Sequence, residues 1–175
     1  AADELRVEVG ALLRHRLAAL GDGARAHELD VRELASWERL RDALGGELDA
    51  LVNNAARTEF RSFWEIDVDE WDDVLATNLR GAYLDCRVVG AALRERGQGR
   101  IVNLASDAAF AASGRSGVHY AASKAGVIAL TRRAATELAP YGVTVNAVAP
   151  AAVDGPLARS VLRDRLDEKL ADIPV

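Results

Sequence analysis

The sequence sets a phenol and an ammonium one helical turn apart, because Tyr120 comes four residues before Lys124 in the stretch HYAASKAG. Residues at this spacing share one face of a helix. A free phenol has a pKa of about 10, and a cation close by favours the phenolate and lowers that pKa. The spacing therefore predicts that Tyr120 acts as a general acid or base. Lys124 can also reach a polyhydroxyl ligand such as a ribose.

A third polar group, Ser106, follows an apolar segment fourteen residues before Tyr120. Its hydroxyl can donate a hydrogen bond to a substrate oxygen and stabilise charge that develops there. Together the three groups suit the interconversion of a carbonyl and an alcohol, with the hydride supplied by a cofactor because no side chain can supply one. Each group alone has a simpler explanation. Most Tyr–Lys pairs at this spacing are surface pairs, and a serine after a strand usually bonds to the backbone.

Segments typical of helices and strands alternate along the chain. This alternation predicts an α/β fold with a doubly wound, Rossmann-like parallel sheet covered on both faces. We take residues 1–175 as a single, partial domain of this kind. Helices are expected over residues 36–44, 69–96, 118–139 and 156–170, with Ser36 as the cap of the first and a further helix, or a short strand, within 5–20. Strands are expected over residues 24–31, 48–55, 100–106 and 142–150, of which the second and third are predicted to be buried.

Ligands of such sheets bind beyond the carboxyl ends of the strands. The carboxyl ends of the predicted strands carry Asp30, Asn53, Ser106 and Pro150. Each of these residues alone is a weak signal. Their order along one chain, with Tyr120 between the third and fourth predicted strands, is far more specific.

This order of motifs resembles the classical short-chain dehydrogenases/reductases, which use NAD(H) or NADP(H). The motifs are Asp-Val after one strand, then NNAA, TNLRGAY, VNLAS, Y-x-x-x-K and NAVAP, and they extend over roughly residues 20–170. The resemblance implies an oxidoreductase that transfers a hydride between NAD(P) and a secondary alcohol or ketone. It also implies that Tyr120 is the general acid/base and contacts the cofactor. Lys124 would bind the nicotinamide ribose and lower the pKa of the tyrosine, and Ser106 would polarise the substrate oxygen.

The same resemblance implies roles for the neighbouring residues. Asn78 would complete the catalytic set and hold a water in a proton relay behind the lysine. Asp30 and Val31 would contact the adenine. Asn53 and Ala55 would lie beside the cofactor ribose at a strand end. Pro150 and Val153 would contact the nicotinamide carboxamide. Simpler roles stay open: Asn53 can tie the sheet to a loop, Asn78 can kink its helix, and His119 is more simply a pocket-lining or surface residue than a base.

The sequence departs from the family pattern at the cofactor site. It has no opening strand followed by the glycine-rich turn T-G-x-x-x-G-x-G, so we expect it to be a fragment of a longer enzyme. Ala56 and Ala151 stand where the family has glycine, and Gly155 stands where a threonine often bonds the cofactor. The missing turn keeps open a non-catalytic or truncated protein of this fold that acts only in assembly. The extended branch of the superfamily, which modifies nucleotide sugars, shares Y-x-x-x-K, but NNAA fits the classical branch better.

Composition limits the location, the cofactors and the partners that we expect for the protein. The net charge of −5 does not suggest a nucleic-acid partner, and Cys86 is the only cysteine, so a reducing, cytoplasmic location is natural. The three histidines lack the spacing of a metal site, and no stretch approaches the ~20 apolar residues of a membrane span. The expected partners are a small-molecule alcohol or ketone and further copies of this chain. A dimer or the tetramer usual in the family would form through helices 69–96 and 118–139, the second of which is apolar on more than one face.

Overall fold

A computed structural model describes residues 26–45, 48–110, 116–151 and 153 of the chain. The chain divides into two compact units, Ala1–Asp30 and Val31–Val175, and we describe each by itself. Of the first unit the structure describes residues 26–30, which form neither helix nor strand. The elements below belong to the second unit.

Three parallel strands form the described sheet: β1 (Ala50–Asn53), β2 (Gly99–Leu104) and β3 (Val143–Val148). β2 lies in the middle, with Asn53 opposite Asn103 and Leu104 opposite Val148. Because all three strands run in the same direction, their carboxyl ends meet at one edge of the sheet. This is the edge at which the sequence predicts a ligand site.

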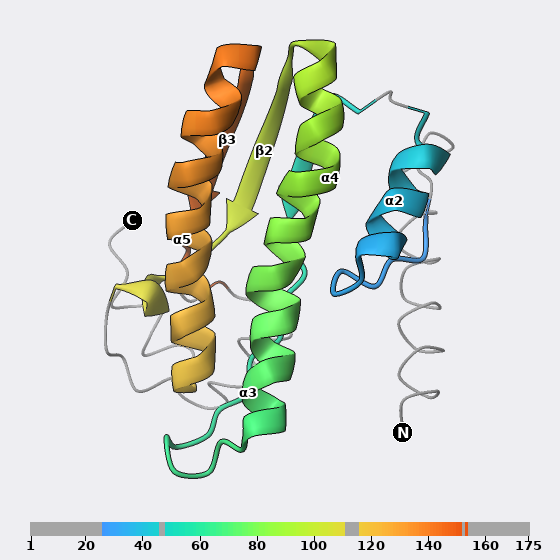
Figure 1. Ribbon diagram of the computed structural model, residues 1–175. Coiled ribbons are helices and arrows are strands. Elements are labelled where there is room, and N and C mark those ends of the chain that lie inside the picture. Colours follow the sequence, from blue (N-terminus) through green and yellow to red (C-terminus); the bar gives the residue numbers. More distant parts are fainter. Residues whose placement is uncertain (1–25, 46–47, 111–115, 152, 154–175) are drawn as a thin grey trace. The chain divides into compact units, whose positions relative to one another are not determined.

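Helices connect the strands and pack against one face of the sheet. Figure 1 shows α4 and α5 side by side in front of β2 and β3, with α2 beside α4. The alternation of β2 agrees, since Ile101 and Asn103 are buried whereas Arg100 is exposed. The helices are α2 (Leu34–Ala43), α3 (Val68–Leu75), α4 (Gly81–Arg96) and α5 (Val118–Leu138), with the π-helix η1 (Ala76–Arg80) and the 3-10 turns η2 (Asp107–Ala109) and η3 (Ala139–Tyr141).

Local sequence signals set the ends of these helices. α3 begins after Asp67, whose side chain accepts the N–H of Glu70 at 2.8 Å and so satisfies a donor that the helix cannot pair. α4 ends at Gly97, which adopts the left-handed φ of 72°. Gly142, with φ 73°, follows η3, and a Cβ there would lie 2.4 Å from the Gly97 carbonyl oxygen. Only glycine fits this turn.

The long helix predicted over residues 69–96 is present, but a π-helical segment interrupts it. α3 passes through η1 into α4, and within this region the Thr77 hydroxyl donates to the Asp73 carbonyl oxygen at 2.9 Å. π-helical turns are rare and often occur at functional sites. Here the buried Asn78 lies in the middle of the π-helical segment.

The close approach of Val31 to α4 explains Gly81, the glycine of the TNLRG motif. A Cβ on Gly81 would lie 3.2 Å from Cγ2 of Val31, so α4 packs tightly against the segment that leads into α2. Asp85 follows one turn later on the same helical face and is fully buried. Neither of its carboxylate oxygens has a hydrogen-bond partner among the residues that the structure describes.

Two strand predictions require correction. Within the strand expected over residues 24–31, the described residues 26–30 are irregular and Val31 begins a turn. A strand forms only where a neighbouring strand completes its hydrogen bonds, which local composition does not reveal. β1 was expected to be buried, yet Val52 is 60% exposed, because β1 lies at the edge of the described sheet and the described helices cover only one of its faces.

Two further predictions concern helices. Ser36 is not the cap of α2, because that helix begins earlier, after Glu33, and encloses the buried Ser36. The helices expected within residues 5–20 and over 156–170 lie outside the described residues. Among the described helices, none is both long enough and apolar enough to cross a membrane.

Candidate active site

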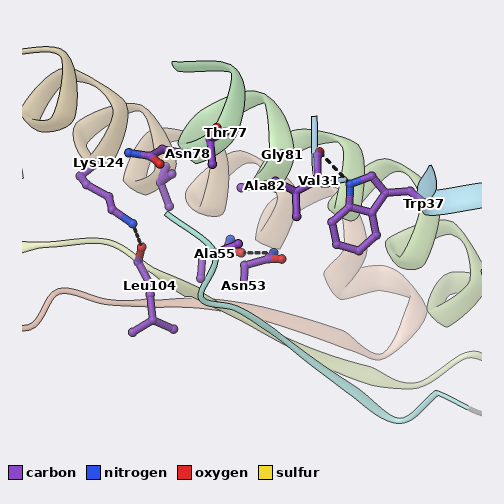
Figure 2. A pocket seen from close by; sticks show the side chains of 12 residues that line it. Val31, Trp37, Asn53, Ala55, Thr77, Asn78, Gly81, Ala82, Leu104 and Lys124 are labelled. Carbon is purple, nitrogen blue, oxygen red and sulfur yellow. Dashed lines mark hydrogen bonds between the residues drawn. The ribbon is translucent and has the colours of Figure 1, made fainter. Parts of the chain in front are cut away.

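A small cavity lies at the carboxyl ends of β1 and β2, beneath α4 and α5 (Figure 2). Its volume is about 20 Å3, enough for one water-sized molecule. Four residues that the sequence analysis assigns to cofactor binding line it, together with Asn78 from η1. These four come from three segments of the chain and are Val31, Asn53, Ala55 and Lys124.

The Lys124 side chain lies within α5 and is only 4% exposed. Its Nζ donates to the carbonyl oxygen of Leu104, the last residue of β2, at 2.5 Å. Burial lowers the pKa of Lys124 to about 8, because an ammonium is stabilised by water that the cavity largely excludes. An ammonium carries three hydrogens and the bond to Leu104 uses one, so the group can still donate to a ligand.

Ser106 and Tyr120 lie beside this lysine. Ser106 follows β2, where its hydroxyl donates to Oδ1 of Asp107 at 3.0 Å and accepts the N–H of Ala108 at 3.2 Å. Tyr120 lies in the first turn of α5, and Nζ of Lys124 is 5.7 Å from the centre of its ring. The predicted catalytic serine, tyrosine and lysine are therefore brought together at one place.

The electrostatic prediction for Tyr120 is wrong in this structure. Burial raises the pKa of the Tyr120 phenol, a hydrogen bond with the Ser106 side chain lowers it, and the charge of Asp107 raises it. The expected lowering by Lys124 is not observed because the phenolate would be poorly hydrated and the ammonium is directed to the Leu104 carbonyl. The phenol therefore favours its protonated form.

The Asn78 side chain holds the loop after β1 and also contacts α5. Its Oδ1 accepts the N–H of Arg57 at 2.8 Å, and its Nδ2 donates to the Arg57 carbonyl oxygen at 2.8 Å and to Oγ of Ser123 at 3.0 Å. One side chain thus joins the loop that follows Ala55 to helix α5. Ser123 was not identified from the sequence, because only its contact with a residue 45 positions away distinguishes it.

Asn53 is linked across the sheet by a chain of side-chain hydrogen bonds. Its Nδ2 donates to Oδ1 of Asn103 at 2.7 Å, and Nδ2 of Asn103 donates to Oγ1 of Thr131 at 2.9 Å. Asn53 therefore both lines the cavity and ties β1 to β2. Asn103 and Thr131 are additional buried residues of the site that sequence reasoning missed.

The other predicted cofactor-binding residues lie in different settings. The Pro150 carbonyl oxygen accepts the N–H of Asp107 at 3.0 Å, which places the end of β3 next to Ser106. Val153 is exposed and belongs to no helix or strand. Asp30 ends the short segment 26–30 of the first unit and is partly buried there.

The remaining residues to place are His119, the exposed aromatic residues and the side chains that could bind a metal. His119 is fully buried next to Tyr120, whereas Trp64 is 90% exposed. Phe60, Phe63 and Phe110 are also exposed, so none of them belongs to the core. Among the described residues no group of three or more His, Cys, Asp or Glu side chains could hold a metal ion.

Comparison with known proteins identifies the family of the chain. The family model for short chain dehydrogenase matches residues 5–166. The 3-oxoacyl-(acyl-carrier-protein) reductase FabG of Staphylococcus epidermidis is 43% identical over 133 residues, which cover 74% of this chain and 53% of that protein. D-threitol dehydrogenase of Mycolicibacterium smegmatis is 36% identical over 87% of this chain and 60% of its own length. The chain thus spans between half and two thirds of the length of these relatives.

Solved structures show the same fold. A 3-oxoacyl-(acyl-carrier-protein) reductase of Brucella melitensis superposes with a TM-score of 0.77 and 32% identity, covering 83% of this chain and 56% of that one. A structure of such a reductase from Brucella melitensis with bound NAD has a TM-score of 0.69 at 33% identity, over 75% of this chain and 52% of that one. ElxO with NADP bound has a TM-score of 0.72 at 27% identity, over 78% of this chain and 56% of that one. The matched residues and the shared fold show that this chain belongs to the short-chain dehydrogenase family, with a Rossmann-like fold.

Proposed function

We propose that the protein is an NAD(P)-dependent oxidoreductase that interconverts a secondary alcohol and a ketone. One observation supports this most strongly: Ser106, Tyr120 and Lys124 gather beside a cavity that Val31 and Asn53 line from other segments. This gathering needs four separate parts of the chain to converge at the carboxyl edge of the sheet. A protein that acted only in assembly would have no need of it.

Tyr120 is the proposed proton donor in the reducing direction. Its hydroxyl gives a proton to the substrate oxygen while the Ser106 hydroxyl donates a hydrogen bond to the same oxygen, and both stabilise the charge that develops. The raised pKa of Tyr120 suits this direction, because the phenol is protonated before the reaction begins. When the cofactor is bound, its nicotinamide ring supplies the hydride.

The residues around the cavity fit the nicotinamide and ribose half of NAD or NADP. Lys124 has hydrogens left for ribose hydroxyls, Asn53 and Ala55 lie at the adjoining strand end, and Pro150 lies next to Ser106. The adenine end would be held by Asp30 and Val31. Two structural relatives, the Brucella melitensis reductase with bound NAD and ElxO with NADP bound, support a cofactor of this class.

Replacing Lys124 by methionine should weaken NAD(P)H binding to the full-length protein by about 10- to 100-fold, because a hydrogen bond from a charged group contributes about 1.5–3 kcal/mol. Energy transfer from tryptophan to bound NAD(P)H measures the affinity. Trp37 lines the cavity, so W37F should reduce the transfer. An unaltered affinity of K124M would remove Lys124 from the cofactor site.

The substrate class can be tested with probes drawn from the relatives. A 3-oxoacyl thioester tests reduction and D-threitol tests oxidation, since enzymes named for these reactions are similar to this chain. We expect NAD(P)-linked turnover of an alcohol or ketone that stops in the Tyr120 variant described below. A full-length protein that neither binds NAD(P)H nor turns over any ketone or alcohol would favour the role in assembly alone.

We also propose that the protein forms a homodimer or homotetramer through α4 and α5. The outer face of α5 presents the small residues Ala122, Ala125 and Ala129, and α4 presents the partly exposed Tyr83. Small side chains let two helices approach closely. Light scattering should give a dimeric or tetrameric mass for the full-length protein, and A125R should shift it toward the monomer. A monomeric wild-type protein would contradict this assembly.

We propose a cytoplasmic location for the protein. Cys86, its only cysteine, is unpaired, and burial raises the pKa of its thiol to about 12, so it is kept as an unreactive thiol. A small-molecule substrate is the proposed partner besides further copies of the chain.

A further inference from the structure

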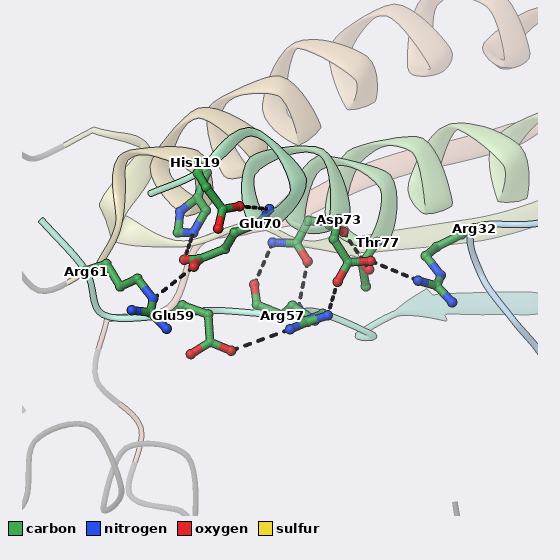
Figure 3. A network of polar contacts seen from close by, with 10 residues as sticks. Arg32, Arg57, Glu59, Arg61, Glu70, Asp73, Thr77 and His119 are labelled. Atoms are coloured by element: carbon green, nitrogen blue, oxygen red, sulfur yellow. Dashed lines mark hydrogen bonds and ion pairs between the residues drawn. The ribbon is translucent and has the colours of Figure 1, made fainter. Parts of the chain in front are cut away.

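The fully buried His119 is held at both ring nitrogens, and Figure 3 shows its contact with Glu70. Its Nδ1 accepts the backbone N–H of Tyr120 at 2.9 Å. Its Nε2 lies 3.0 Å from Oε1 of Glu70, and Oε2 of Glu70 pairs with Nε of Arg61 at 2.8 Å. Because Nδ1 accepts a hydrogen bond, the hydrogen of the neutral ring lies on Nε2 and is donated to Glu70.

The bond from Tyr120 to His119 replaces a missing helix cap. The first N–H groups of a helix have no partner within the helix, and the residue before α5 is Gly117, which has no side chain to cap them. The His119 ring folds back over this glycine: a Cβ on Gly117 would lie 2.3 Å from Cε1 of the ring. Gly117 and His119 therefore act as one unit at the start of α5.

The other polar backbone group of Tyr120 is held in a similar way. Its carbonyl oxygen accepts the Ser123 hydroxyl at 2.7 Å, and Oγ of Ser123 in turn accepts Nδ2 of Asn78 at 3.0 Å. Glu70 lies in α3 and Asn78 in η1. Two chains of hydrogen bonds thus connect one continuous helical segment to the N–H and the C=O of Tyr120.

We propose that His119 is a positioning residue that fixes the backbone of Tyr120, and that Glu70 orients its ring for this task. The inference rests on the proposed role of Tyr120 as proton donor. Proton transfer depends steeply on the placement of the donor, and an error of about 1 Å can cost about 100-fold in rate. His119 itself does not touch the substrate oxygen in this account; it acts through the first turn of α5.

Two substitutions separate the two ring contacts. Asn places its Oδ1 where Nδ1 of the ring lies, so H119N keeps the acceptor for the Tyr120 N–H and loses the contact with Glu70. Gln places its amide where Nε2 lies, so H119Q keeps the contact with Glu70 and loses the cap. We expect H119N to retain kcat within about threefold, and H119Q and H119L to lose about 100-fold, with little change in the KM for NAD(P)H.

A double-mutant cycle tests the role of Glu70. E70A should lower kcat about tenfold when His119 is present and should add no loss in the H119N background, because the ring that it orients is then absent. E70Q, whose amide oxygen still accepts the Nε2 hydrogen, should lie between wild type and E70A. E137Q serves as the matched control and should leave kcat unchanged. It removes the carboxylate of an exposed ion pair between Glu137 and Arg133, both of which lie in α5 like His119.

The outcomes separate this inference from the proposed function. A wild-type protein with no more activity than Y120F would overturn the proposed function, and this inference with it. An active wild type whose H119Q and H119L variants keep full kcat, or whose H119N loses as much as H119Q, would overturn the inference alone. Thermal denaturation of each variant distinguishes a loss of kcat from a loss of folded protein.

Discussion

The Y120F variant should lose about 100- to 10,000-fold in kcat for NAD(P)H-dependent carbonyl reduction and still fold. Phenylalanine removes the hydroxyl that donates the proton, and a positioned general acid contributes typically 100- to 10,000-fold. The backbone bonds of Tyr120 to His119 and Ser123 do not involve the hydroxyl and remain. Initial rates with a 3-oxoacyl thioester measure the loss, and circular dichroism checks the fold.

The companion variant S106A isolates the second group on the substrate oxygen. We expect a smaller loss than in Y120F, because a hydrogen bond to the oxygen is lost while the proton donor remains. The binding of NAD(P)H should be nearly unchanged in Y120F, since Lys124 keeps its bond to the Leu104 carbonyl oxygen. Normal turnover in Y120F would exclude the phenol from the chemistry.

The D85V variant should be more stable than the wild type, and the difference should grow as the pH rises from about 4 to about 8. Burial raises the pKa of Asp85 from 3.8 to about 8, and among the described residues neither oxygen has a hydrogen-bond partner. Between these two pH values the folded protein binds a proton at Asp85 and the unfolded chain does not. The free energy of unfolding of the wild type therefore falls with rising pH by up to about 1.4 kcal/mol per pH unit, and it levels off above about pH 8.

Urea denaturation at several pH values measures this effect. D85V should remove the fall in the free energy of unfolding between pH 4 and 8, and D85N should remove it as well while gaining less stability, because its amide stays buried. E95Q provides the control, since Glu95 is an exposed carboxylate on the same helix. A wild-type stability that does not fall over this range would show that Asp85 is ionised and paired in solution.

The sequence predicts most of the described helices because their signals are local. α5 was expected over residues 118–139 and extends from Val118 to Leu138, since Pro140 disfavours a continued helix. The edge position of β1 could not be read from its composition, because an apolar run shows that burial is favoured but not which neighbours supply it. The π-helical form of η1 likewise has no sequence signal in TNLRG beyond the position of Asn78.

The candidate site was predictable in its residues but not in its interactions. The spacing of Tyr120 and Lys124 indicated a shared helical face, and the two do lie close together. The predicted direction of the pKa shift of Tyr120 was wrong, because that shift depends on burial, which only the folded chain defines. The link between His119 and Glu70 joins residues 49 positions apart, so no local pattern could reveal it.

A crystal structure of the full-length protein with NAD(P)H tests the central claim most directly. The account predicts a ribose hydroxyl within hydrogen-bonding distance of Nζ of Lys124 and the reactive carbon of the nicotinamide facing the space beside the Tyr120 and Ser106 hydroxyls. A cofactor bound elsewhere, or a nicotinamide that cannot face both hydroxyls, would contradict it.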